Sequence, residues 1–102
     1  MKFQLVLQWP CASIGDYDGL IEIENTLIAK TNKAIRVDGH DAGSGEMNIF
    51  IHTNDPLTAF EEVRGTIGSG DMWTAVRVAY REIKKDDYTI LWPEELKEFR
   101  VT

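Results

Sequence analysis

The chain of 102 residues has the length of one domain, and its 43% hydrophobic and 27% charged residues are typical of a globular protein with a core. These values exclude a disordered, collagen-like or low-complexity chain and a chain with two independent cores. With 17 acidic and 11 basic residues the formal net charge is −6, which argues against nucleic acid or a membrane surface as a partner and leaves room for a basic protein.

The cysteine content and the hydropathy pattern concern the cellular compartment. Cys11 is the one cysteine of the chain, so it cannot form an internal disulfide. The sequence contains neither a signal-peptide pattern nor an apolar stretch of about 18 residues that could cross a membrane. We therefore expect a cytoplasmic protein with a single domain, residues 1–102.

The first elements are a strand and a helix. Residues 2–9 alternate in part between apolar and polar side chains, which predicts a strand that ends at Pro10 because proline cannot donate to the ladder. Apolar residues then recur at helical spacing, which predicts a helix from about Asp16 to Thr31, with Asp16 or Asp18 as its cap.

The middle of the chain predicts two short strands and a second helix. The strands are expected at 34–38 and 47–52, and the segment 39–46 with its three glycines is expected to be a loop, too long for a two-residue hairpin turn. Asp55 followed by Pro56 is a strong signal for a helix start, because the carboxylate can accept free amide hydrogens and proline fits the first helical position.

The last third predicts two more strands. Alternation over 72–83 is typical of a half-buried antiparallel strand, and 88–92 forms a fifth short strand that Pro93 ends. The segment 84–87 is a polar turn, and 94–99 is expected to form one amphipathic helical turn.

This order of elements predicts the fold class. Strand, helix, strand, strand, helix and strand, with one extra strand at the end, is the split βαβ pattern of the ferredoxin-like fold, an α+β sandwich. Right-handed crossovers then predict the spatial order of strands two, three, one, four, five. We expect both helices on one face of the antiparallel sheet, with Leu5 and Ile49 on adjacent inner strands.

Three segments carry a family resemblance. Asp38–Ile51 reads DGHDAGSGEMNIFI, Asp55-Pro56 is followed by Ala59-Phe60, and Tyr88–Pro93 reads YTILWP. Together they resemble a group of small uncharacterised bacterial proteins of ferredoxin-like build. The resemblance covers most of the chain and implies the fold, but it implies no activity and no catalytic residues.

Polar residues distant in the sequence are expected to meet at one end of this fold. With the first strand running toward that end, its exit loop, the loop between strands two and three and the entry to strand four all lie there. The residues expected to converge are Asp16, Asp18, Asp38, His40, Asp41, Glu46 and Asp71. The opposite end receives Lys30, Lys33, Lys84 and Lys85, beside Asp86 and Asp87.

The residues expected at this acidic end bear on three roles: phosphate binding, cation binding and capping of the first helix. The carboxylates repel phosphate, and no Walker or dinucleotide pattern is present. Asp38, Asp41, Ser44 and Glu46 offer oxygens for Ca²⁺ or Mg²⁺ without the spacing of an EF-hand. Capping of the first helix and bonding of turn amides by these aspartates is the favoured interpretation, so no metal and no cofactor is assigned.

His40 beside Asp41 suggests a general base with Ser44 as nucleophile. Adjacent residues usually point apart, and no nucleophile elbow surrounds Ser44, so a solvent-facing or turn-bonding His40 is favoured and no catalytic residue is assigned. Cys11 precedes the first helix, whose dipole could activate a thiol, but the role of a small apolar residue is favoured.

The sheet face away from the helices is expected to be open. It should carry the side chains of Gln4, Val6, Gln8, Asn48, Phe50, His52, Ala75, Arg77 and Ala79, while Phe3, Leu5, Leu7, Met47, Ile49, Ile51, Val76 and Val78 face the helices. Val6, Phe50, Ala75 and Ala79 would then form a modest apolar patch of the kind that meets a partner.

From these observations the candidate binding residues are Asp38, His40, Asp41, Ser44, Glu46, Asn48, Phe50, His52 and Arg77. We expect a small acidic, non-enzymatic binding protein that docks a partner through the open face or the acidic end, and an immunity-type or regulatory role against a basic protein would suit its charge. The alternative is a ligand-binding or enzymatic homodimer that uses the open sheet face.

Overall fold

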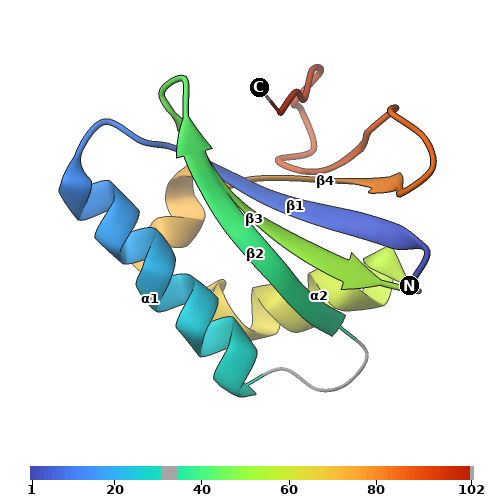
Figure 1. Ribbon diagram of the computed structural model, residues 1–102, viewed down its shortest axis with the longest axis horizontal. Helices are drawn as coiled ribbons and strands as arrows, with labels where there is room; N and C mark the ends of the chain where they lie inside the picture. The colour runs from blue at the N-terminus through green and yellow to red at the C-terminus, as the bar shows by residue number, and fades with distance from the viewer. Residues whose placement is uncertain (31–34, 102) are drawn as a thin grey trace.

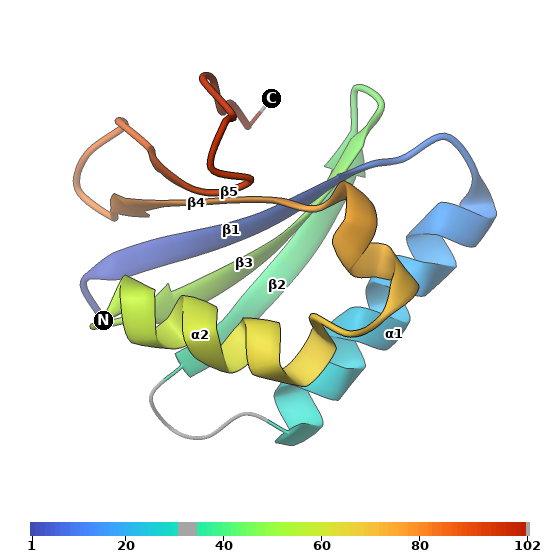
Figure 2. The same cartoon turned by 180° about the vertical axis from the view of Figure 1, so that it is seen from behind.

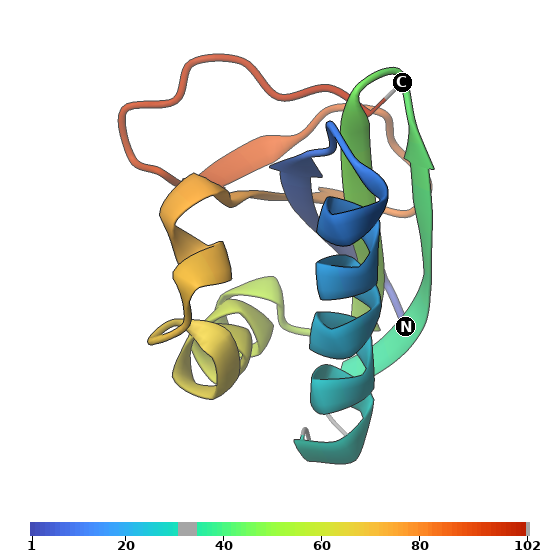
Figure 3. The ribbon, with the colours of Figure 1, turned by 90° about the vertical axis from the view of Figure 1, so that its left-hand side faces the viewer.

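Five antiparallel strands form one sheet, and two helices cover one of its faces (Figures 1 and 3). The computed structural model describes residues 1–30 and 35–101. The elements are β1 (Phe3–Pro10), α1 (Ile14–Lys30), β2 (Ile35–Gly43), β3 (Glu46–Thr53), α2 (Pro56–Ile67), the 3₁₀-helix η1 (Asp71–Ala75), β4 (Arg77–Glu82) and β5 (Thr89–Trp92). This is an α+β sandwich, the class that the sequence predicts.

The strands lie in the order β2-β3-β1-β4-β5, and each neighbouring pair is antiparallel. β1 pairs with β3 so that Leu5 lies opposite Ile51 and Leu7 lies opposite Ile49. The expectation that Leu5 and Ile49 lie on adjacent inner strands is therefore confirmed.

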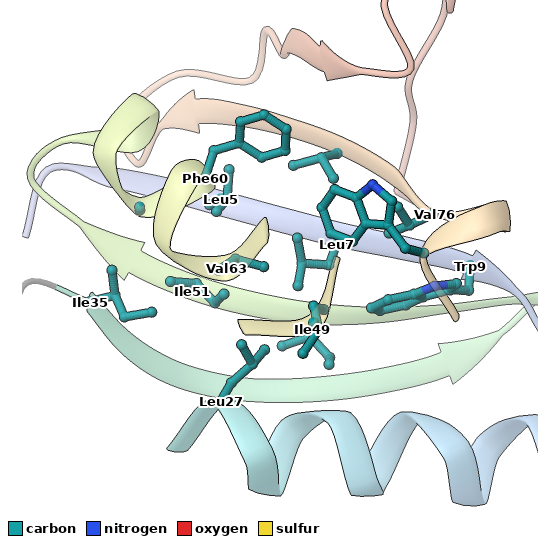
Figure 4. Packing of buried hydrophobic residues seen from close by; sticks show 14 of the residues in the cluster. Leu5, Leu7, Trp9, Leu27, Ile35, Ile49, Ile51, Phe60, Val63 and Val76 are labelled. Atoms are coloured by element: carbon teal, nitrogen blue, oxygen red, sulfur yellow. The ribbon is translucent and has the colours of Figure 1, made fainter. Parts of the chain in front are cut away.

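The core lies between the sheet and the two helices, where β1 and β3 present their alternate side chains (Figure 4). Leu5, Leu7, Ile49 and Ile51 have no accessible surface, and Val63 from α2 is equally buried against them. The predicted inward-facing residues belong to this core, apart from Phe3, which is half-buried.

α1 begins two residues earlier than predicted. The hydroxyl of Ser13 accepts a hydrogen bond of 3.2 Å from the backbone N–H of Asp16, so Ser13 and not an aspartate caps the helix. Asp16 instead accepts from the backbone N–H of Ala12 at 2.9 Å, which ties the loop after β1 to the helix. The predicted helix end at Thr31, the strand start at Ala34 and Lys33 lie outside the described residues.

α2 begins as predicted. The carboxylate of Asp55 accepts hydrogen bonds from the backbone N–H of Thr58 at 3.2 Å and from the Thr58 hydroxyl at 2.8 Å, and Pro56 is the first helical residue. These hydrogen bonds, that of the backbone N–H first, hold the pKa of Asp55 below its ordinary value.

This lowered pKa predicts a pH dependence. The charged cap stabilises the fold above the pKa that Asp55 has in the unfolded chain, and this contribution is lost as the pH falls through the lower pKa of the folded state. Asp55→Asn keeps a capping oxygen but removes the titration. We expect the melting temperature of this variant to fall less steeply than that of the wild type between about pH 5 and pH 2. Parallel acid limbs would contradict this assignment.

The segment 39–46 is a hairpin and not a loop. β2 continues to Gly43 and β3 begins at Glu46, so Ser44 and Gly45 form a two-residue turn with φ of 56° and 79°. Positive φ at both turn positions matches the twist of the flanking strands. The prediction of a loop is wrong because a bulge lets the strand continue. Asp38 has no register partner on β3, and Gly39, which follows it with φ of 151°, is paired again.

The turn carries a stability prediction. Ser44 adopts a left-handed conformation that asparagine tolerates better than serine. Ser44→Asn is therefore expected to raise the free energy of unfolding, measured by urea denaturation, by about 0.5 kcal/mol. Ser69→Asn is the matched control, because Ser69 does not have a positive φ, and it should leave the stability unchanged. An equal effect of both substitutions would refute the role of the turn.

The last third of the chain differs from the prediction at two places. Residues 72–75 belong to η1 and not to a strand, so that β4 starts only at Arg77. The segment 94–99 forms no helical turn; the backbone N–H of Leu96 closes a tight turn on the carbonyl of Pro93 at 3.1 Å, and irregular chain follows. None of the helices in the described ranges is long and apolar enough to cross a membrane.

Candidate functional site

A polar row crosses four strands on the sheet face away from the helices. Asp41 lies opposite Asn48, Asn48 opposite Gln8, and Gln8 opposite Arg77. The Asn48 amide donates to Asp41 at 2.8 Å, and the Gln8 amide donates to Asn48 at 3.0 Å. Gln8 and Asn48 are almost fully buried, so each amide needs these partners to offset the loss of water.

The C-terminal segment, residues 93–101, lies on this same side of the sheet (Figure 2). The Gln8 amide also donates to the carbonyl of Arg100 at 2.9 Å, which fixes the segment to β1. Arg77 donates to Glu46 at 2.7 Å, and together these four residues line a cleft of about 550 Å³ under the segment.

The expected open face is therefore wrong in its central part. Val6 and Ala79 have no accessible surface, although they point away from the helices. Ala75 lies in η1 and does not belong to this face. Phe50, which lies opposite Val6, is half-buried, so of these three strand residues it alone keeps exposed surface.

A second polar group lies farther along the same face. His52 faces Arg36, whose guanidinium lies 3.1 Å from Nδ1 of the imidazole, and Nε2 lies 3.5 Å from the Asp38 carboxylate. Asp38 also contacts Arg36 at 3.7 Å. Asp38 was expected at the acidic end, but it lies at the bulge of β2 near His52 and does not reach that end.

His40 points toward the helices and bridges α1 to β2. Its Nδ1 lies 2.9 Å from both carboxylate oxygens of Glu24, and its Nε2 lies 2.9 Å from the hydroxyl of Tyr17. A carboxylate oxygen accepts, so Nδ1 donates to Glu24, and Nε2 shares a hydrogen bond with the hydroxyl of Tyr17. The side chains of Glu24 and His40 are only 12% and 27% exposed.

These contacts separate His40 from Asp41. His40 faces α1, whereas Asp41 faces Asn48 on the other side of the sheet. The interpretation of His40 as a solvent-facing or turn-bonding residue is wrong, since it joins a helix to a strand. Ser44 lies in the exposed hairpin turn, apart from both residues, so the general-base arrangement with a serine nucleophile does not form.

The oxygens considered for a cation are also dispersed. Asp38 pairs with His52, Asp41 with Asn48 and Glu46 with Arg77. Among the residues that the structure describes, no three His, Cys, Asp or Glu side chains come together as metal ligands. Cys11 is half-buried against the core, which agrees with the role of a small apolar residue.

Other carboxylates do meet at the end of the sheet that carries the hairpin turn. The backbone N–H of Cys11 donates to the carbonyl of Gly45 at 2.8 Å, and the indole N–H of Trp9 donates to the carbonyl of Met72 at 2.7 Å. The start of α1, the β2–β3 turn and η1 therefore lie together. We call this surface the acidic end.

Two cavities flank η1 at the acidic end. The first, of about 280 Å³, is lined by Asp16 and Asp71 together with Trp9. The second, of about 560 Å³, is lined by Asp71 again, by Trp73 and Trp92, and by Glu95. Asp71 thus belongs to both cavities, and the expected convergence of Asp16 with Asp71 is confirmed.

Sequence reasoning missed several of these residues. The sequence pattern places Tyr17 and Glu24 on a helix but does not predict their contacts with His40. It likewise does not predict the hydrogen bond between Gln8 and Asn48, because side-chain contacts between different elements leave no local pattern. Trp73 and Trp92 were assigned to strands, and the one available signal was the glycine-rich segment 68–70, which precedes η1 and lines the larger cavity.

A scan against protein-family models, a search of curated proteins and a search of solved structures gave no match to this chain. The resemblance to small bacterial proteins therefore stays an expectation from the sequence.

Proposed function

We propose that this chain is a non-enzymatic binding module of ferredoxin-like fold that docks a basic surface of a protein partner on its acidic end. The strand order β2-β3-β1-β4 with helices after β1 and β3 supports the fold assignment. An immunity-type or regulatory role, in which the module covers a basic protein, is the specific form of this function.

One observation carries the proposal. η1 places the Asp71 carboxylate in two adjacent cavities, one shared with Asp16 and Trp9, the other shared with Glu95, Trp73 and Trp92. Tryptophan is among the residue types that carry most of the binding energy at protein interfaces. Complementary charge also speeds the encounter of two proteins, and the net charge of −6 favours a basic partner.

The test is carbodiimide crosslinking of carboxylates to lysines of bound proteins, with the crosslinked peptides mapped by mass spectrometry. We expect crosslinks at Asp16 and Asp71, and we expect Asp16→Asn/Asp71→Asn to reduce capture about 10-fold. The double variant Asp86→Asn/Asp87→Asn is the matched control. It changes the net charge by the same amount, but in the loop between β4 and β5, at the end of the sheet opposite to the acidic end. Equal capture by both variants, or crosslinks mainly at Asp86 and Asp87, would exclude docking at the acidic end.

A second candidate function is a ligand-binding or enzymatic homodimer. It is favoured by the cleft of about 550 Å³, in which Gln8, Glu46 and Arg77 offer an amide, a carboxylate and a guanidinium. Light scattering during size-exclusion chromatography separates the candidates: a dimer whose mass is independent of concentration supports the second, and a monomer at high concentration rejects it.

A further inference from the structure

The larger cavity beside η1 has a composition that points to a class of ligand. Its volume of about 560 Å³ is within the range of small-molecule sites. Trp73 and Trp92 line it with ring centroids 6.1 Å apart and planes inclined by 41°. Trp73 is 9% exposed and also stacks on Phe60, so Trp92 offers the larger free surface. The segment 68–70 forms another part of its wall.

Two carboxylates accompany the indoles. Asp71 and Glu95 both line the cavity, and in the described part of the chain neither forms an ion pair. Indole faces attract cations through the ring quadrupole, and carboxylates attract them by charge. An anion would be repelled by both carboxylates, and an uncharged apolar ligand would gain nothing from them. The cavity therefore selects an organic cation.

A contact of Trp92 within the chain favours a planar cation over an ammonium group. The guanidinium carbon of Arg64 lies 4.8 Å from the centroid of the Trp92 ring, so this indole already takes a planar cation from within the chain. Guanidinium groups stack on aromatic planes and donate to carboxylates through a rigid fork, which an ammonium group does not do.

We propose that this cavity binds the guanidinium group of an arginine side chain, with the half-buried indole of Trp92 as the stacking surface, the exposed margin of Trp73 beside it, and the carboxylates of Asp71 and Glu95 as acceptors. The inference builds on the proposed function, because an arginine of the basic partner would be the anchor at the acidic end. Free arginine derivatives carry the same group, so they serve as probes that need no partner.

The experiment follows the three indole N–H signals in ¹H–¹⁵N correlation spectra during titration with N-acetyl-arginine amide. N-acetyl-citrulline amide, which is uncharged and of nearly the same shape, is the matched ligand control. We expect the signals of Trp73 and Trp92 to shift with a dissociation constant of about 1–10 mM. The signal of Trp9, whose indole is bonded to the Met72 carbonyl, should shift least.

Variants then test the acceptors and the competing cation. Glu95→Gln and Asp71→Asn are each expected to weaken binding about 5-fold, whereas Asp87→Asn should not change it. Arg64→Gln removes a cation already stacked on Trp92, so it should tighten binding about 2- to 5-fold. Equal binding of the citrulline derivative, a largest shift at Trp9, or no shift up to about 50 mM would overturn the proposal.

The two proposals can fail separately. If the arginine derivative binds the cavity but Asp16→Asn/Asp71→Asn captures partners as well as the charge-matched control, the arginine site stands and docking at the acidic end is wrong. If capture depends on Asp16 and Asp71 while the derivative does not bind, docking stands and the arginine anchor is wrong.

Discussion

His40→Ala is expected to lower the free energy of unfolding by about 2–3 kcal/mol, measured by urea denaturation at neutral pH. The imidazole is the partner that holds the Glu24 carboxylate, which is 12% exposed, and it is also hydrogen-bonded to the Tyr17 hydroxyl. Its removal leaves a largely buried carboxylate without its hydrogen-bonding partner. The cost is set below that of a fully buried pair because His40 is 27% exposed and water can enter the space that it leaves.

The same sheet provides a matched control. His52 also contacts a carboxylate, that of Asp38, but the Asp38 and Arg36 side chains are 45% and 67% exposed. His52→Ala should therefore cost no more than about 0.5 kcal/mol. In the His40→Ala background, Glu24→Leu should restore part of the stability, because it replaces the unpaired carboxylate by an apolar side chain. Equal costs for the two histidine substitutions would refute the role assigned to the bridge between α1 and β2.

Removal of residues 94–102 is expected to lower the free energy of unfolding by about 3 kcal/mol and to cause self-association. Gln8 would lose the carbonyl of Arg100 as a hydrogen-bond acceptor while remaining in the sheet. Val6 and Ala79, which now have no accessible surface, lie on the same sheet face as Gln8, from which the C-terminal segment would be absent. Newly exposed apolar area on a sheet face favours pairing with a second copy.

Denaturation and light scattering on the truncated chain measure both effects. Arg100→Ala is the control, since it keeps the backbone carbonyl that Gln8 uses and removes only an exposed ion pair with Glu98; it should change stability by less than about 0.5 kcal/mol. A truncated chain as stable as the wild type would show that the segment does not hold the sheet face.

Local chemistry was predicted well from the sequence, and the reason is the same in each case. Asp55 followed by Pro56 predicts a helix start, because the capping residue and the first helical turn are neighbours in the chain. The alternation around Leu5 and Ile49 likewise encodes which face of each strand is buried. The topology alone predicts that Asp16 and Asp71 lie near each other, because Asp16 follows β1 and Asp71 precedes β4, and these two strand ends lie at the same end of the sheet.

The errors concern interactions between distant segments. His40 and Glu24 are 16 residues apart on different elements, and nothing around either residue indicates the other. Gln8 and Arg100 are 92 residues apart, so the covering of the presumed open face had no local signal. The prediction of a loop at 39–46 is wrong because glycine is common in both loops and bulges, and only the pairing with β3 shows a bulge at Asp38 and Gly39.

The bulge at Asp38 and Gly39 affects how readily copies of the protein aggregate in concentrated solution. β2 is an edge strand of nine residues, and a regular edge of that length offers unpaired amides and carbonyls on which another chain can add a strand. The bulge bends this edge, and the charged side chains of Arg36 and Asp38 stand on either side of Val37. We therefore expect β2 to resist the addition of a strand from another chain, and with it the growth of fibrils.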